Sequence, residues 1–186
     1  TVRSAGKKDC RIKLAAKSSF VRDFWLSEID VASRTQTYLS ACHECNCPPN
    51  VRIFNGTVQT RGEVYVENHP LEINALGSLV MFCRLHRAEG DTLTAIALEN
   101  TRLGDNHMEL ISSFLNFTPQ LIELTLAENL ISNVGLRTFL GSLTMCKKLE
   151  ILNLSSNFIS DKGIEDLGAA LECLPDIRGL KLAHNQ

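Results

Sequence analysis

Long apolar runs and aromatic side chains are both scarce in this sequence of 186 residues. No apolar run reaches the roughly 18 residues that a membrane-spanning helix needs, and no charged-then-apolar leader opens the chain. Only 6% of the residues are aromatic, and they do not alternate with basic residues as they do on nucleic-acid-binding surfaces. We therefore expect neither a membrane nor a nucleic acid as the partner.

Signatures of catalysis are also missing. The sequence has no phosphate-binding glycine loop, no nucleophile elbow and no zinc-protease helix. We therefore predict a protein that is not an enzyme, with no catalytic residues, no cofactor and no small-molecule substrate.

The seven cysteines are odd in number and are not arranged as a compact disulfide scaffold. This favours a reduced, soluble, cytoplasmic protein. The chain starts at Thr1 rather than Met and stops at Gln186 within a repeat, so we expect a fragment of a longer protein.

Charge is unevenly distributed. The net charge is −2, but residues 1–22 carry seven basic side chains against one acidic, so they sum to +6 and the remainder to −8. A basic arm joined to an acidic body suggests an anionic partner for the arm, although a merely solvated tail is the alternative. The basic residues predicted to form this arm are Arg3, Lys7, Lys8, Arg11, Lys13 and Lys17.

An internal repeat occupies the second half of the chain. Copies begin at the evenly spaced positions Leu93, Leu121, Leu149 and Ile177, and an irregular copy containing Val64, Val66 and Leu71 lies upstream at a slightly longer interval. Each copy starts with an L-x-L strand whose apolar side chains point inward. An Asn then turns the chain and satisfies backbone groups of neighbouring turns, except that Thr101 replaces it and can do so only in part. These turn residues are Asn129, Asn157 and Asn185.

A helix is predicted in the second half of each copy, because apolar residues recur there at helical spacing. Asp105, Ser132 and Ser160 are the predicted N-cap residues, and Pro119 and Pro175 follow the helices where the chain turns back into a strand.

This pattern resembles the leucine-rich repeat family, in particular its ribonuclease-inhibitor-like group with 28-residue repeats. The resemblance implies an α/β fold, a curved leucine-rich-repeat solenoid with a parallel inner sheet and outer helices. We expect a basic extended arm at residues 1–19, a helical N-terminal cap at 20–63, and leucine-rich repeats at 64–186, about four plus a truncated last one. The edge after Leu182 is expected to be open, to be covered by more repeats or by a partner.

The segment ahead of the repeats has a resemblance of its own. A helix is expected through residues 35–45 and is ended by Pro48 and Pro49. Tyr38, Cys42, Pro48 and Val51 are similar to the cap of cilium-associated leucine-rich-repeat proteins such as the nexin–dynein regulatory complex subunit 5. The resemblance implies that this cap covers the first repeat.

Cysteine and histidine are concentrated at Cys42, His43, Cys45 and Cys47, and thiolates and imidazoles are zinc ligands. A structural zinc site usually needs a second ligand pair from a separate segment, and none stands out. We therefore predict no metal, with zinc as the open alternative, and expect Cys83, Cys146 and Cys173 to be small core residues.

The concave face of such a solenoid is the usual binding surface. The alternation of side chains along the strands predicts which residues face solvent there, and they are mildly acidic in the early copies and mildly basic in the last. The candidates are Glu99, Glu123, Thr125, Glu128, Asn153, Ser155, Lys181 and His184.

We predict from these observations a protein–protein interaction scaffold in a large cytoskeletal assembly. The cap resemblance favours the axoneme of a cilium or flagellum, with tubulin or axonemal subunits as partners. The alternative is a small-GTPase regulator resembling the Ran GTPase-activating protein, which is built on the same repeats. The sensor portion of a nucleotide-binding immune receptor ranks third, because no nucleotide-binding domain is visible.

Overall fold

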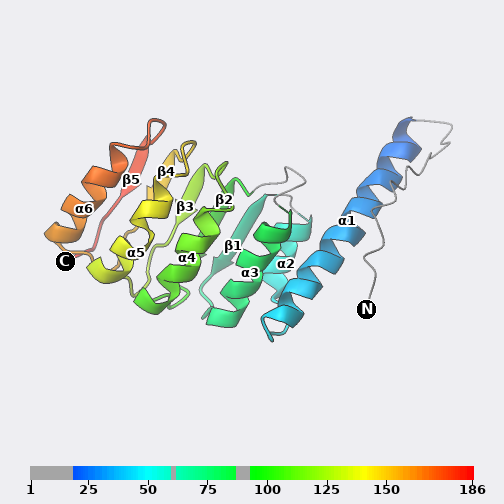
Figure 1. Ribbon diagram of the computed structural model, residues 1–186, viewed down its shortest axis with the longest axis horizontal. Helices are drawn as coiled ribbons and strands as arrows, with labels where there is room; N and C mark the ends of the chain where they lie inside the picture. Colours follow the sequence, from blue (N-terminus) through cyan, green and yellow to red (C-terminus); the bar gives the residue numbers. More distant parts are fainter. Residues whose placement is uncertain (1–18, 60–61, 87–92) are drawn as a thin grey trace, which may run out of the picture.

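In the part of the chain that the structure describes, one parallel sheet of five strands organises the fold. The computed structural model describes residues 19–59, 62–86 and 93–186, and its strands follow one another in chain order (Figure 1). The strands are β1 (Glu63–Glu67), β2 (Ala95–Glu99), β3 (Glu123–Thr125), β4 (Ile151–Asn153) and β5 (Gly179–Lys181). The α/β class and the five predicted strand segments are confirmed.

The register of the sheet follows the sequence repeat. Val64 of the irregular copy pairs with Ile96, and Ile96, Leu124 and Leu152 then pair in turn at the even spacing of the regular copies. Each residue therefore lies beside its counterpart in the next copy, and apolar side chains stack in rows. All four of these apolar residues are at most 1% exposed.

Helices connect the strands and pack in series along the sheet (Figure 1). They are α3 (Ile73–His86), α4 (Met108–Leu115) with the short 3₁₀ turn η3 (Asp105–His107) before it, α5 (Asn133–Leu143) and α6 (Asp161–Leu171). Their apolar sides and the inward side chains of the strands form one continuous core. No helix in the described part of the chain is long and apolar enough to cross a membrane.

The turn asparagines act as predicted. Asn157 Oδ1 accepts a hydrogen bond from the Ile131 N–H at 3.1 Å, in the preceding repeat. Its Nδ2 donates to the carbonyl oxygens of Leu126, Leu154 and Ser155. Asn129 occupies the same position one repeat earlier, and its Oδ1 accepts from the backbone N–H of Leu103.

Thr101 replaces the asparagine only in part, also as predicted. Its hydroxyl has one proton to donate, and the acceptors within reach are the Leu98 carbonyl at 3.1 Å and Asn129 Oδ1 at 3.3 Å. Asn129 Oδ1 also accepts from the Thr101 N–H, so the asparagine of the next repeat supplies what the threonine lacks.

A second set of hydrogen bonds runs between repeats at the helix starts. The Asp105 carboxylate accepts from the Ser132 N–H at 2.8 Å and from the Ser132 hydroxyl at 2.6 Å. One repeat later, Asn133 Oδ1 accepts from the Ser160 N–H at 3.0 Å, and Asn133 Nδ2 donates to Ser160 Oγ at 2.7 Å.

These bonds correct part of the N-cap prediction. Ser132 does cap its helix, because its hydroxyl oxygen accepts from the Val134 N–H. Ser160 occupies the N-cap position but makes no side-chain capping bond, and Asp105 lies inside η3 rather than at a cap. Both side chains instead connect one repeat to its neighbour.

Two glycines allow this contact between repeats. A Cβ atom at Gly135 would collide with the Asp105 carboxylate, and one at Gly163 would collide with Asn133 Oδ1. The first turns of α5 and α6 therefore need glycine at these positions.

Three helical segments precede the sheet: α1 (Ser19–Glu44), α2 (Val51–Phe54) and the π-helical turn η1 (Asn55–Gln59). The helix predicted at residues 35–45 is therefore only the end of a helix of 26 residues, since nothing in residues 19–34 breaks it. α1 contacts α3 and η1, while α2 and η1 contact β1. Tyr38 and Cys42 are buried in these contacts, but Val51 is 70% exposed.

Candidate protein-binding surface

The sheet has one face turned away from the helices, which we call the open face. Side chains alternate along each strand, so residues next to the buried apolar positions point to this face. It comprises residues 63, 65 and 67 of β1 and their register partners along β2 to β5.

The first three strands give the open face an acidic character around one aromatic ring. Tyr65 is 46% exposed, and its hydroxyl lies 3.3 Å from Glu63 Oε2 as a hydrogen-bond donor. Glu67 pairs with Glu99 in the register, and Ala95 pairs with both Glu63 and Glu123. Small residues form a low floor beside the ring and the carboxylates; these are Ala95, Ala97 and Ala127, which are at most 8% exposed.

Electrostatics at Tyr65 agree with this arrangement. Partial burial raises the pKa of the Tyr65 hydroxyl, and the nearby carboxylates, led by Glu63, raise it further. The ring therefore stays neutral and keeps its O–H donor at physiological pH. A neutral aromatic ring among carboxylates is suited to an arginine or lysine side chain of a partner.

The β1 residues of this surface were missed by the sequence analysis. Glu63, Tyr65 and Glu67 alternate with Val64 and Val66, which had already been assigned to the inner side. The signal was therefore available, but the candidate list began only with the regular copies.

Most predicted site residues do lie on the open face, namely Glu99, Glu123, Thr125, Asn153, Ser155 and Lys181. The prediction that Thr125 faces solvent was wrong, because it is only 6% exposed and belongs to the floor of small residues. Asn153 Oδ1 accepts from the Ser155 N–H at 3.1 Å, which turns this amide oxygen toward its own strand.

The placement of Glu128 and His184 on the strand face is also corrected, because both residues lie in the turn beyond the strand. Their backbones are left-handed, with φ values of 54° and 58°, as are those of the equivalent residues in every other copy. The equivalent residues are Asn68, Asn100 and Ser156. These positions shape the turns, which is why asparagine is found there twice.

The two halves of the open face differ in charge. Lys181 is exposed on β5, and Arg178 lies just before it with its guanidinium 3.6 Å from Glu150. Carboxylates dominate at β1 to β3, and Lys181 is the cation that β5 adds to the open face, while Arg178 lies outside the strand beside Glu150.

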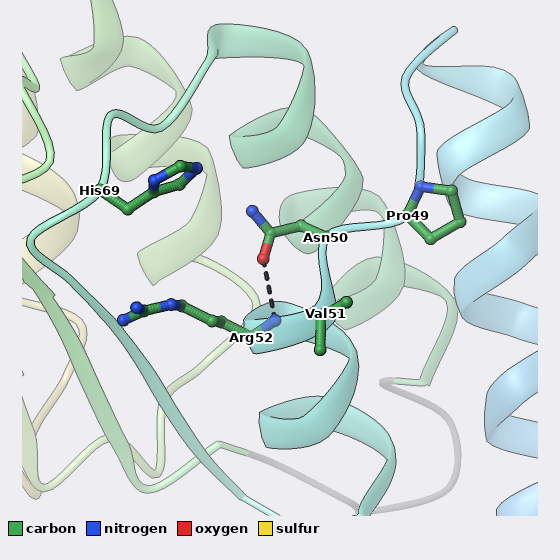
Figure 2. A pocket seen from close by; sticks show the side chains of 5 residues that line it. All are labelled: Pro49, Asn50, Val51, Arg52 and His69. Atoms are coloured by element: carbon green, nitrogen blue, oxygen red, sulfur yellow. Dashed lines mark hydrogen bonds between the residues drawn. The ribbon is translucent and has the colours of Figure 1, made fainter.

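An open hollow lies beside the end of β1 and was not predicted (Figure 2). It has a volume of about 390 Å³ and is lined by Pro49, Asn50, Val51, Arg52 and His69. Asn50 Oδ1 accepts from the backbone N–H groups of Arg52 and Ile53. The Arg52 guanidinium donates to the Glu67 carbonyl at 2.8 Å, which places the hollow beside the β1 end of the open face.

The cysteine- and histidine-rich segment does not converge on a metal site. His43 is exposed and lines a different hollow with Gln36 and Glu44. Within the described ranges, no three His, Cys, Asp or Glu side chains are grouped so as to hold a metal ion.

The remaining cysteines behave in two ways. Cys83 and Cys146 are buried as predicted, and burial raises their pKa values to about 12 and about 11. Cys173 is exposed, so its assignment to the core was wrong. The predicted basic arm, Arg3 to Lys17, lies outside the described residues.

No family model matches the chain. Among solved structures, the fold is similar to that of the leiomodin-1 actin-binding site 2, with a TM-score of 0.56 and 19% sequence identity. The match covers 73% of this chain and 80% of that chain. At this identity the similarity concerns the fold alone.

Proposed function

We propose that this protein is a non-enzymatic, leucine-rich-repeat binding module that holds a cytoskeletal protein on its open face. The observation that carries the proposal is the exposed Tyr65 ring, set among carboxylates of three neighbouring strands beside a floor of alanines. Aromatic side chains of this kind are typical anchors of protein interfaces, and the small floor residues leave room for a partner's side chain.

The cytoskeletal setting is supported by the structural similarity to a protein described as an actin-binding site. The ribonuclease-inhibitor-like repeat class is supported by the 28-residue register, and a cap role for α1, α2 and η1 by their contacts with α3 and β1. The resemblance of the cap to cilium-associated proteins supports a more specific version of the proposal, in which the protein lies in the axoneme and binds tubulin.

Charge defines the partner surface. Glu63, Glu67, Glu99 and Glu123 would face it, so the partner should present lysine or arginine side chains, one of them over Tyr65. The contact should weaken as salt is raised, because much of it is between exposed charges.

Cosedimentation with actin filaments and with microtubules tests the proposal. We expect binding to one of the two polymers, weakened at least about tenfold by Tyr65→Ala and by the double charge reversal Glu99→Lys with Glu123→Lys. The double reversal Glu109→Lys with Glu165→Lys is the matched control, since it changes the net charge by the same amount but at exposed carboxylates of α4 and α6, on the helical side.

Equal loss of binding in the control variant would show that only net charge matters and would overturn the open-face assignment. Absence of binding to both polymers would reject the cytoskeletal partner. A GTP-hydrolysis assay with small GTPases would then test the regulator alternative.

The basic arm is tested separately. Deleting residues 1–18 should reduce binding to microtubules, because it removes contacts with acidic patches of their surface that are separate from the basic patch required by the open face. The reduction should disappear at high salt. Unchanged binding at low salt would leave the arm without a role in the assembly.

A further inference from the structure

The end of α1 brings two cysteines together through the backbone. The Cys47 N–H donates to the Cys42 carbonyl oxygen at 3.0 Å, and between them the Asn46 N–H donates to the His43 carbonyl at 3.1 Å. Asn46 has a φ of 50° and so reverses the chain in the left-handed conformation. This is a Schellman-type helix end, in which the side chains at the two ends of the longer hydrogen bond normally make an apolar contact.

In this chain both positions of that contact are thiols. Cys42 is 2% exposed within the core, and Cys47 packs against the same core from the partly exposed side. Because only one hydrogen bond of 3.0 Å separates the two backbones, standard bond lengths keep their Cα atoms within about 7 Å. Disulfides commonly join Cα atoms roughly 4.4–6.8 Å apart.

We propose that Cys42 and Cys47 form a reversible redox modification site, in which oxidation closes a disulfide across the end of α1. The two thiols release two protons and two electrons as the S–S bond forms. The oxidant is a low-molecular-weight disulfide such as glutathione disulfide, which leaves as two thiols after a mixed disulfide on one cysteine is displaced by the other.

The environment assigns an order to these steps. Cys47 is partly exposed, so it meets the oxidant first, and buried Cys42 then displaces the leaving thiol. Partial burial raises the pKa of the Cys47 thiol, and Cys42 close by raises it further, although a hydrogen bond with Ser78 opposes the shift. Bridge formation should therefore accelerate as the pH is raised above neutrality.

Cys45 lies between the two, and its thiol is also partly exposed. Its side chain faces Gly77 of α3, where a Cβ atom would lie 3.5 Å from Cys45 Sγ. It is therefore the residue to remove for an unambiguous test and the competitor to examine in the unmodified chain.

The experiment treats the Cys45→Ser chain with glutathione disulfide, blocks the remaining thiols after denaturation and analyses the tryptic peptide of residues 35–52. We expect a peptide two hydrogen atoms lighter that takes up no blocking reagent and regains both thiols after reduction. In the same background, Cys42→Ala should instead accumulate a stable glutathione adduct on Cys47. Glutathione should add to exposed Cys173 in every sample, and this adduct is the internal control that the oxidant has acted.

Two outcomes would overturn the proposal: free thiols at Cys42 and Cys47 after Cys173 has fully reacted, or a lasting adduct on Cys47 with Cys42 still present. Hydrogen exchange on the Cys45→Ser chain, before and after oxidation, gives an independent measurement. The Cys47 amide should exchange more slowly in the oxidised protein than in the reduced one, and equal exchange would contradict a bridge at this position. None of these outcomes depends on whether the open face binds a partner.

Discussion

Strands β4 and β5 carry nearly the same sequence pattern but lie in different surroundings. Leu152 on β4 is 0% exposed, whereas Leu180, its register partner on β5, is 41% exposed. Asn157 is buried, and its counterpart Asn185 is only partly buried. The same residues therefore contribute differently to stability, according to whether a described repeat lies on both sides or on one.

The comparison shows where the fold obtains its cohesion. A single repeat cannot cover its own apolar row, so most of its stabilisation comes from the contacts with its neighbours. At the other end of the sheet, Val64 and Val66 on β1 are 0% exposed, and the segments that contact this strand besides β2 are α2 and η1.

The largest expected difference is between the two leucines. Leu152→Ala should lower the free energy of unfolding by about 3 kcal/mol, because it removes buried methyl groups and leaves a cavity. Leu180→Ala should cost less, about 1 kcal/mol, since Leu180 is already 41% exposed and its removal leaves no enclosed cavity. Urea denaturation of both variants measures this difference, and equal losses would contradict it.

The turn asparagines should show the next effect. Asn157→Ala leaves the Ile131 N–H and several carbonyl groups without their partner, so we expect a loss of about 3 kcal/mol. Asn185→Ala should lose about 1 kcal/mol, because water can reach the groups it leaves. Thermal unfolding followed by circular dichroism compares the two, and a larger loss for Asn185→Ala would show that burial does not control the contribution.

The smallest effect on stability is expected for two glycines of α6, and it has opposite signs at the two positions. Gly163→Ala should destabilise by about 1–2 kcal/mol, because its Cβ would collide with Asn133 Oδ1, and the Asn133 amide is held in place by one hydrogen bond through Oδ1 and one through Nδ2. Gly168→Ala should stabilise by about 0.5–1 kcal/mol, since nothing lies within 4 Å and alanine favours the helix. Melting temperatures that move in the same direction for both variants would contradict the close approach at Gly163.

The sequence predicted the repeats well because each repeat is marked both by its spacing and by its apolar pattern. The strand register agrees with the spacing of the sequence copies, and the asparagine contacts were anticipated from chemistry alone. By contrast, the role of Asp105 was predicted wrongly. From the sequence alone, a polar residue just before a helix is expected to be its N-cap. The hydrogen bond between Asp105 and Ser132 exists only because neighbouring repeats stack, so the sequence of one repeat does not predict it.

The candidate surface was predicted less completely, for a related reason. Exposure on a sheet depends on neighbouring strands as well as on alternation, so Thr125 between two strands is covered although it points outward. Tyr65 was missed because it lies in the irregular copy, and the alternation of side chains was applied only to the regular ones. The hollow beside β1 forms where the start of α2 meets the turn after β1, and no pattern within either segment indicates that they meet.

The two sets of hydrogen bonds between repeats connect each repeat to a different neighbour. Asn157 reaches back to the preceding repeat, while Asn133 accepts from the following one, and the partners lie 26 and 27 residues away. The hydrogen bonds join equivalent turns and do not count the residues between them: Asn100 Nδ2 still reaches Asn68 Oδ1 although these two copies are 32 residues apart rather than 28. Insertions are consequently expected to accumulate in the connections between strand and helix, while the turn segments that carry the bonded residues keep their length.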